Sequence, residues 1–256
     1  MTLRLVRPFF IGALALALFA GAASALPITK SLTVQVFLLC DDAGLNCAST
    51  GPAGNDYFED VTDKIWSQAG IDVVFDFAAQ INSTFFSAIN DSVADRGFDD
   101  LAAAYGAGGP SATVVDMFLV HSIAGAYGEG WLGAGGLAIA MDLVMSYNGG
   151  LGRIDTIAHE LGHNLGLVPA SLGGDAGGHS PNPDYLMASG GVRQVPGTAA
   201  NIAPDGLNLD KLPADQIALA RQSSLLQDSD VPEPVSMVLA ASGLFAVVTI
   251  RRRRSA

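Results

Sequence analysis

The stretch AHELGHNLGLVPASLGGDAGGHSPNPDYLMASGG, residues 158–191, decides how this chain is expected to fold. It opens on HELGH, in which His159 and His163 stand four residues apart with Glu160 beside the first of them. The apolar residues of the same segment recur at helical spacing, at Ile154, Ile157, Ala158, Leu161 and Leu165. At about 100° per residue they fall on one face of a helix, and the polar triplet falls on the other. Residues 152–166 are therefore predicted to form a helix that packs on one side and holds a polar cluster on the other.

This polar cluster has the residue types and the spacing of a zinc site. Two histidines four residues apart on a helix can send both imidazoles to one metal ion. A water molecule in the open position of such a zinc ion has a pKa of about 7, and a neighbouring carboxylate can take its proton as it attacks a peptide carbonyl. The pattern predicts His159 and His163 as metal ligands and Glu160 as the catalytic base. The alternative is a chance match, which the helix face and the low count of four histidines argue against.

Together with the later stretch YLMASGG, the motif HELGHNLG resembles the metzincin clan of zinc endopeptidases. Members of this clan carry HExxHxxGxxH, in which the glycine turns the chain toward a third histidine, and a Met-turn beneath the metal. Gly166 matches the glycine and Met187 matches the Met-turn methionine. The resemblance covers most of residues 32–225. It implies a matrixin-like catalytic domain of the α+β class, with a twisted mixed β-sheet packed on the active-site helix and a C-terminal helix after the Met-turn.

The sequence departs from this family at the third ligand, where Pro169 stands in place of a histidine. The chain instead passes through the glycine-rich stretch ASLGGDAGGHSPNPD before the Met-turn. His179, eight residues before Met187, is the first candidate for the displaced ligand. Asp175 is the second, because a carboxylate also binds zinc. His121 is the third, although an ordinary strand-end histidine explains it as well, and a site without a third protein ligand is left open.

Apolar runs and glycine stops predict the remaining elements. Strands are expected at 31–40, 71–77, 112–123 and, in a glycine-rich segment, 125–141, and further helices at 56–69, 98–105 and 209–226. The metzincin resemblance implies that residues 133–140 form the edge strand beside the cleft. There the glycines would let an extended substrate approach by strand addition, although a merely structural role for them is equally open.

The only two cysteines, Cys40 and Cys47, enclose the short loop CDDAGLNC. In an exported protein, an isolated close pair of this kind is predicted to form a disulfide, which stabilises the fold by about 2–3 kcal/mol in the chain-entropy model. Thiolate metal ligands are the alternative, but no further cysteine exists to complete such a site.

Both ends of the chain are predicted to be targeting segments. Residues 1–25 have two arginines, an apolar run and a terminal Ala-Ser-Ala, as in a cleaved secretory signal peptide. An uncleaved membrane anchor is the alternative, which the shortness of the apolar run disfavours. Residues 229–256 contain a Pro-Glu-Pro triplet, a stretch of sixteen uncharged residues and a block of four arginines.

The order of these three parts resembles the PEP-CTERM sorting signal of Gram-negative bacteria. The resemblance implies export through the inner membrane, transient anchoring there by the C-terminal segment and processing by exosortase-type machinery. The protein would then reside at the cell surface or outside the cell. Residues 26–228 remain as the catalytic domain.

The charge balance limits the classes of molecule that the protein is expected to bind. The chain has 13 basic and 25 acidic side chains, and six of the basic ones lie in the two targeting ends. A domain this acidic is not expected to bind nucleic acid or anionic lipid, because both carry charge of the same sign. Acidic loops also suggest calcium as a second ion, although no stretch matches a known calcium loop.

These features leave three candidate functions. The first is an exported zinc-dependent endopeptidase that acts on a protein or peptide substrate. The second is a catalytically inactive metzincin-like binding module of the cell surface or matrix, which Pro169 and the unusual spacing would favour. The third, a purely structural surface protein, leaves the histidine helix unexplained.

Overall fold

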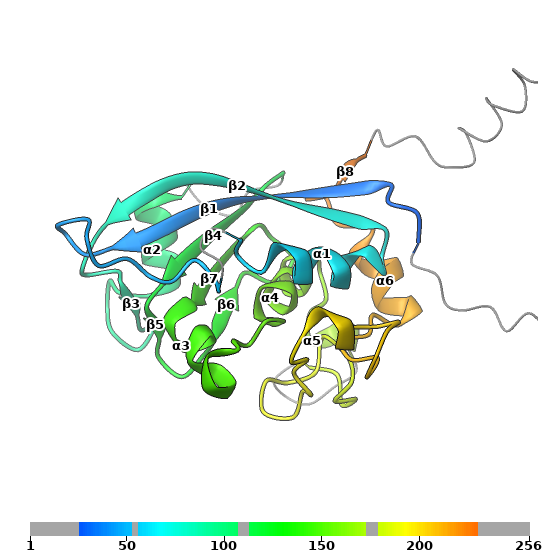
Figure 1. Ribbon diagram of the computed structural model, residues 1–256. Helices are drawn as coiled ribbons and strands as arrows, with labels where there is room; N and C mark the ends of the chain where they lie inside the picture. The colour runs from blue at the N-terminus through cyan, green and yellow to red at the C-terminus, as the bar shows by residue number, and fades with distance from the viewer. Residues whose placement is uncertain (1–25, 53–55, 107–112, 173–178, 230–256) are drawn as a thin grey trace, which may run out of the picture.

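The computed structural model describes residues 26–52, 56–106, 113–172 and 179–229 (Figure 1). The predicted signal peptide, nearly all of the predicted sorting signal and Asp175 lie outside these residues. Within the described residues, no helix is both long enough and apolar enough to cross a membrane.

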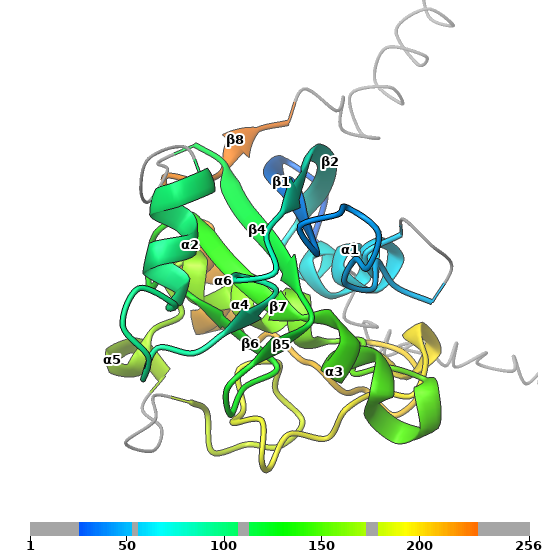
Figure 2. The same cartoon turned by 90° about the vertical axis from the view of Figure 1, so that its left-hand side faces the viewer.

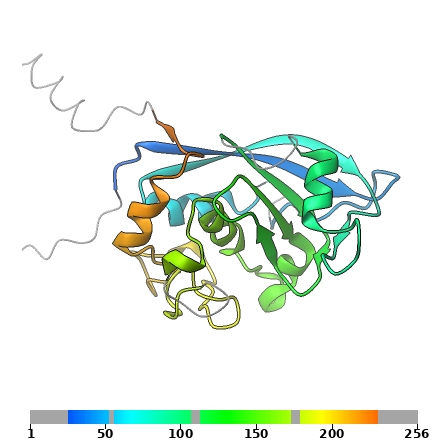
Figure 3. The same cartoon turned by 180° about the vertical axis from the view of Figure 1, so that it is seen from behind.

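The framework of the domain is a mixed β-sheet in the order β2-β1-β4-β7-β6. Its strands are β1 (Lys30–Cys40), β2 (Ile71–Asn82), β4 (Val115–Val120), β7 (Gly136–Ala140) and β6 (Gly128–Gly130). The first four run parallel, and β6 is antiparallel to its neighbour β7. Near the C-terminus, β8 (Gln227–Asp228) pairs antiparallel with the start of β1, as the view from behind shows (Figure 3).

The prediction of one strand over 125–141, with residues 133–140 at the edge of the sheet, is wrong. The structure has a hairpin here, in which β7 lies inside the sheet between β4 and β6, and the edge strand is the short β6. Gly133 has a φ of +72° in the connecting turn, a conformation that favours glycine and breaks the strand. Every residue of β7 is buried, as expected for a strand covered on both faces.

Helices cover both faces of the sheet (Figures 1 and 2). On one face lie α1 (Glu59–Ser67) and α4 (Thr156–Asn164), and on the other lies α2 (Phe98–Tyr105). The remaining helices are α3 (Met141–Ser146), η1 (Tyr147–Gly150), α5 (Pro169–Leu172), η2 (Ala199–Asn201) and α6 (Ala214–Ala220), and a two-stranded sheet pairs β3 (Ala88–Ile89) with β5 (Ser122–Ile123). This is the α+β arrangement that the sequence predicted, with a C-terminal helix following the Met-turn.

Strand β4 shows how the sheet divides the core. Met117 and Leu119 face the larger core beneath α1 and α4, whereas Phe118 and Val120 face the smaller core beneath α2. Side chains alternate between the faces of a strand, so a strand buried on both sides reads as a continuous apolar run. This explains why the segment VDMFLV is apolar except for the buried Asp116.

Helix α4 is shorter than the predicted 152–166. Gly152 and Gly166 have φ values of +88° and +93°, which a right-handed helix does not permit, so they bracket the helix from outside. All nine residues of α4 are buried, including its histidines and glutamate. The apolar face packs into the larger core with Ile157 and Leu161, and this packing fixes the direction of the polar face.

The disulfide joins Cys40, the last residue of β1, to Cys47. It closes a turn in which Leu45 N donates to Asp41 Oδ1 at 2.9 Å. This loop lies at the end of the sheet and contributes no residue to the histidine cluster described below.

Candidate metal centre

Three histidines from two segments meet at the polar face of α4. His159 and His163 come from the helix, and His179 comes from the chain that leads into the Met-turn. Their ligand atoms all lie within 4.8 Å of one another. In the described part of the chain this is the one group of three or more His, Cys, Asp or Glu side chains with such geometry. The acidic loops that suggested calcium form no comparable group among these residues.

The position of His179 follows from backbone pairing near the Met-turn. Ser180, the next residue, forms a parallel bridge with Ala188, and its N–H donates to the Met187 carbonyl at 2.7 Å. Met187 in turn packs directly on α4, where a Cβ added to Gly162 would collide with its sulfur. The Met-turn therefore lies against the metal-site helix and carries His179 with it.

The first stretch after α4 does not reach the cluster. The backbone turns at Gly166, and Pro169 then begins α5. His121, the third candidate for the missing ligand, lies at the other end of the domain beside the disulfide loop. Its Nδ1 is 2.5 Å from Asp142 Oδ2, and its Nε2 is 3.3 Å from the Asn46 carbonyl. His121 is thus the strand-end histidine of the alternative interpretation, and it is excluded as a ligand.

The two histidines of α4 have their Nδ1 atoms next to backbone carbonyls. His163 Nδ1 lies 2.8 Å from the Leu167 carbonyl, and His159 Nδ1 lies 2.7 Å from the Leu186 carbonyl. When Nδ1–H donates to a carbonyl, the lone pair is on Nε2 and is available to a metal ion. The arrangement therefore favours the tautomer that binds zinc.

Arg193 holds the histidine and the Met-turn together. Its Nε donates to Asp155 Oδ2 at 2.7 Å, and its Nη1 donates to the carbonyls of Leu186 and Ala188 at 3.1 and 3.2 Å. The same Nη1 contacts His159 Nδ1. Through these contacts Arg193 ties the Met-turn to the start of α4.

A second buried aspartate, Asp210, lies beside the ion pair of Arg193 and Asp155. Burial and the neighbouring Asp155 carboxylate raise the pKa of Asp210 to about 8. At neutral pH its carboxyl group is therefore protonated and can donate a hydrogen bond to Asp155. A neutral Asp210 also accounts for buried carboxyl oxygens of both aspartates that have no other hydrogen-bond partner.

Burial sets the protonation of the helix residues. It holds the pKa of His159 well below its usual range, with the charge of Arg193 acting in the same direction, and it also lowers the pKa of His163. Both imidazoles are neutral at pH 7, the state in which they bind metal. Burial raises the pKa of Glu160 to about 7, against the opposing charges of Arg193 and Arg153.

The edge hairpin completes the wall around Glu160. A Cβ added to Gly128, the first residue of β6, would lie 2.7 Å from Glu160 Cγ. Glycine is therefore needed at this position for the glutamate to take its place. Asn164, the last residue of α4, donates from Nδ2 to the carbonyls of Trp131 and Gly136, each at 2.9 Å, and so locks the helix to the hairpin.

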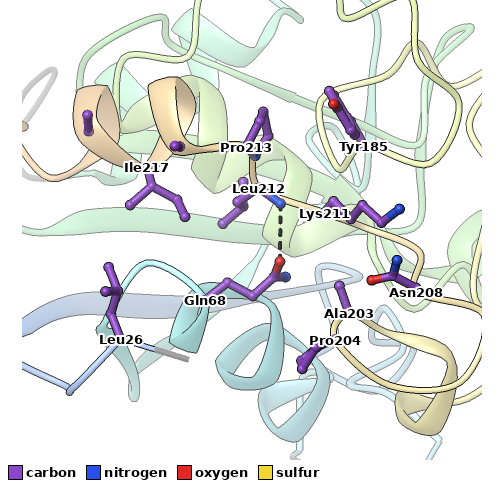
Figure 4. A pocket seen from close by; sticks show the side chains of 12 residues that line it. Leu26, Gln68, Tyr185, Ala203, Pro204, Asn208, Lys211, Leu212, Pro213 and Ile217 are labelled. Atoms are coloured by element: carbon purple, nitrogen blue, oxygen red, sulfur yellow. Dashed lines mark hydrogen bonds between the residues drawn. The ribbon is translucent and has the colours of Figure 1, made fainter. Parts of the chain in front are cut away.

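Glu160, His159 and His179 open onto one cleft of about 440 Å³. A second cavity, of about 570 Å³, lies between α1, α6 and the chain beyond the Met-turn (Figure 4). There Gln68 Oε1 accepts a hydrogen bond from Leu212 N at 3.2 Å, and Ile217 and Pro204 form part of an apolar lining. Because the second cavity has no cluster of histidines or carboxylates, the chemistry belongs to the first.

The residues present fit a zinc ion. Two or three neutral imidazoles are the usual ligands of catalytic zinc, and hydrogen bonds to backbone carbonyls orient such ligands. The ligand nitrogens around a tetrahedral zinc ion lie about 3.4 Å apart, and the ligand atoms of the three histidines, all within 4.8 Å of one another, would need only small movements to reach that spacing. His159 and His179 line the same cleft as Glu160, so a zinc ion held by the histidines would lie beside this carboxylate.

No protein-family model and no curated protein matches the sequence. Among solved structures, the chain is similar to archaemetzincin from Methanopyrus kandleri, with 12% sequence identity and a TM-score of 0.42, over 75% of this chain and 95% of that one. It is also similar to a chain in the structure of a chaperone-substrate complex, with 10% identity and a TM-score of 0.41, over 77% of this chain and 34% of that one. At this level of similarity, neither structure assigns a function to the present chain.

The sequence did not point to four residues that shape the centre: Arg193, Asp155, Asn164 and Gly128. Three of them act across long separations or through the backbone, for which the sequence has no periodic signal. The sequence indicated Gly128 only weakly, as one glycine of a glycine-rich segment in which close approach of another group was expected.

Proposed function

We propose that this protein is an exported zinc-dependent endopeptidase. One observation carries the proposal: three histidines converge, two of them line the same cleft as Glu160, and the glutamate belongs to the helix that carries His159 and His163. The supporting structure is a chain of contacts from Asp155 through Arg193 to the Met-turn, which orients His159.

Each residue of the cleft has a defined task in this proposal. His159, His163 and His179 hold the zinc ion, which when bound supplies a Lewis acid and lowers the pKa of its water. Glu160 accepts the proton of the attacking water and passes it to the leaving amine. Strand β6 is the free edge beside Glu160, so an extended substrate can align its backbone there by strand addition.

The cellular part of the proposal rests on the sequence of the two ends. Residues 1–25 direct export, and residues 229–256 anchor the chain transiently in the inner membrane until exosortase-type machinery removes them. The mature enzyme then acts on protein or peptide substrates at the cell surface or beyond it. The masses of the N- and C-terminal peptides of the protein recovered from its host test this directly.

The alternative function, an inactive binding module, took its support from Pro169 at the third ligand position. The position of His179, whose ligand atom lies within 4.8 Å of those of His159 and His163, supports the enzyme instead.

The decisive experiment combines metal analysis with peptide hydrolysis. Wild type, Glu160→Gln, His179→Ala and His121→Ala are each loaded with zinc, and casein cleavage is measured together with zinc content. We expect Glu160→Gln to keep stoichiometric zinc and lose activity, and His179→Ala to lose zinc affinity by about 100-fold or more. His121→Ala removes a histidine outside the cluster and is expected to keep its zinc. A wild type that binds no zinc when zinc is abundant would refute the proposal.

A further inference from the structure

The cleft beside Glu160 is lined by a buried cation with an incomplete set of partners. Arg153 is 4% exposed, and its Nη2 donates to the Gly190 carbonyl at 3.0 Å. Its guanidinium lies over the Tyr127 ring, 4.8 Å from the centroid. Its buried Nε makes no hydrogen bond, and the Asp155 carboxylate oxygen facing it is 3.8 Å away, beyond hydrogen-bonding distance.

The neighbouring Arg193 differs from Arg153 in its hydrogen-bond partners. Its Nε and Nη1 bond to Asp155 and to two carbonyls, so its donors are largely used within the protein. The Asp155 oxygen closest to Arg193 is therefore committed. Asp210 adds no second full charge, because burial raises its pKa to about 8. The guanidinium of Arg153 has the rings of Tyr127 and Tyr147 beside it, at 4.8 and 5.6 Å from their centroids, but it shares its one carboxylate, at 3.8 Å, with Arg193.

A second unpaired group lines the same cleft. Thr156, the first residue of α4, is 2% exposed, and its hydroxyl has no hydrogen-bond partner. A buried hydroxyl without a partner is costly, and each such group in a native structure calls for an explanation, such as a functional role or a bound water or ion. Thr156 also lies at the positive end of the helix dipole, which favours an anion. Two residues of one wall, Arg153 and Thr156, thus each carry a buried donor atom without a hydrogen-bond partner, and one of the two residues is charged.

We propose that this wall is a subsite for a carboxylate group of the substrate, bound by Arg153 and Thr156. The inference rests on the proposed peptidase function and adds its substrate class: peptides with Asp, Glu or a free C-terminal carboxylate close to the cleaved bond. A neutral side chain in the subsite leaves both donors unpaired, and a basic one adds repulsion. Glu160 does not satisfy Arg153, since no ion pair within 4.0 Å joins these two residues in the described part of the chain.

The test compares peptides that differ in one charge only. End-blocked fluorescent octapeptides carry a single Glu or Gln, moved in turn through the three positions on each side of the cleaved bond. A second pair ends in a free carboxylate or an amide, which separates a side-chain source from a C-terminal source. At one position we expect wild type to prefer the acid by about tenfold or more in kcat/KM, as for a charged hydrogen bond. Equal rates for acid and amide at every position would overturn the inference.

Variants assign the preference to the two residues. Arg153→Met is expected to reduce the preference to less than about twofold, and Thr156→Val to reduce it about threefold. The control, Lys64→Met, removes one positive charge from an exposed ion pair with Asp205 and is expected to keep the full preference. An unchanged preference in both cleft variants contradicts the assignment. Should Arg153→Met fail to fold, wild type and Thr156→Val still decide the question.

A binding measurement separates this inference from the proposed activity. The affinities of metal-free wild type for the same Glu and Gln peptides are compared by fluorescence anisotropy. Tighter binding of the acid by about tenfold, together with no cleavage of any peptide by the zinc-loaded protein, supports the subsite and refutes the peptidase. Cleavage without any preference for the acid in rate or affinity supports the peptidase and refutes the subsite.

Discussion

Replacing Gly128 by alanine tests how closely the edge strand fits Glu160, the catalytic base of the proposed peptidase. The added Cβ would lie 2.7 Å from Glu160 Cγ, 3.0 Å from its Oε1 and 3.0 Å from Ile139 Cδ1. Ordinary carbon contacts are about 3.5–4.0 Å, so the glutamate has to move by about 1 Å. Gly128 belongs to a hydrogen-bonded strand and cannot easily retreat.

A displacement of about 1 Å at a catalytic group costs roughly 100-fold in rate. We therefore expect Gly128→Ala to lower kcat by about this factor, while zinc affinity stays within about twofold because no histidine is touched. Peptide hydrolysis and zinc competition with a chelator measure the two quantities. The matched control is Gly130→Ala on the same strand, whose Cβ would approach Gly136 O and Asn164 Nδ2 at 3.2 and 3.3 Å but not Glu160.

The double variant Gly128→Ala/Glu160→Gln identifies the cause of the expected loss in kcat. If Gly128→Ala acts through the glutamate, it has almost no further effect in the Glu160→Gln background, because groups that act as a unit are not additive. A Gly128→Ala enzyme with kcat within about threefold of wild type would refute the reasoning, since it would show that the glutamate has room to spare. An equal loss in Gly130→Ala would shift the cause from the contact with Glu160 to the strand as a whole.

Two further predictions concern the support of the site and the stability of the fold. Arg193→Lys loses the planar guanidinium contacts that hold Asp155 and the Met-turn, so zinc affinity should fall about 10–100-fold. Competition with a chelator measures this affinity, and an unchanged value would contradict a positioning role for Arg193. Burial raises the pKa of Asp63 to about 6 from its ordinary 3.8, so its charge destabilises the folded state increasingly between about pH 4 and 6, and the full cost persists above that range. Asp63→Asn, which keeps an acceptor for the Val73 N–H, should therefore raise the free energy of unfolding by about 1–2 kcal/mol at pH 7, after allowance for solvent screening, and leave it unchanged at pH 3.5. Urea unfolding at both pH values checks this, and an equal gain at both would show that the carboxylate charge is not the cause.

The parts of the site that lie within one helix were accessible from the sequence. His159, Glu160 and His163 follow from helical spacing, because the apolar face of α4 fixes where the polar face points. The same logic of local periodicity predicted the buried strands of the sheet. It failed at 125–141, where a glycine turn divides the chain into two strands and moves the edge to β6.

Selection among the distant candidates required the tertiary structure. His121 and His179 were both open as ligands, and spacing alone could not separate them. The backbone bridge from Ser180 to Ala188 brings His179 to the cluster, whereas His121 remains with Asp142 near the disulfide.

The contacts that tune the centre have no sequence signal at all. Arg193 stands 38 residues after Asp155, and 34 after His159, yet it bonds to the first and contacts the second. Such pairs form only because the sheet and the Met-turn place the ends of separate segments together in a buried space. The sequence by itself determined the chemistry of one helix face, since that depends on neighbours three and four residues apart. Only the tertiary structure decided which distant side chains complete that face, because burial and long-range packing select them.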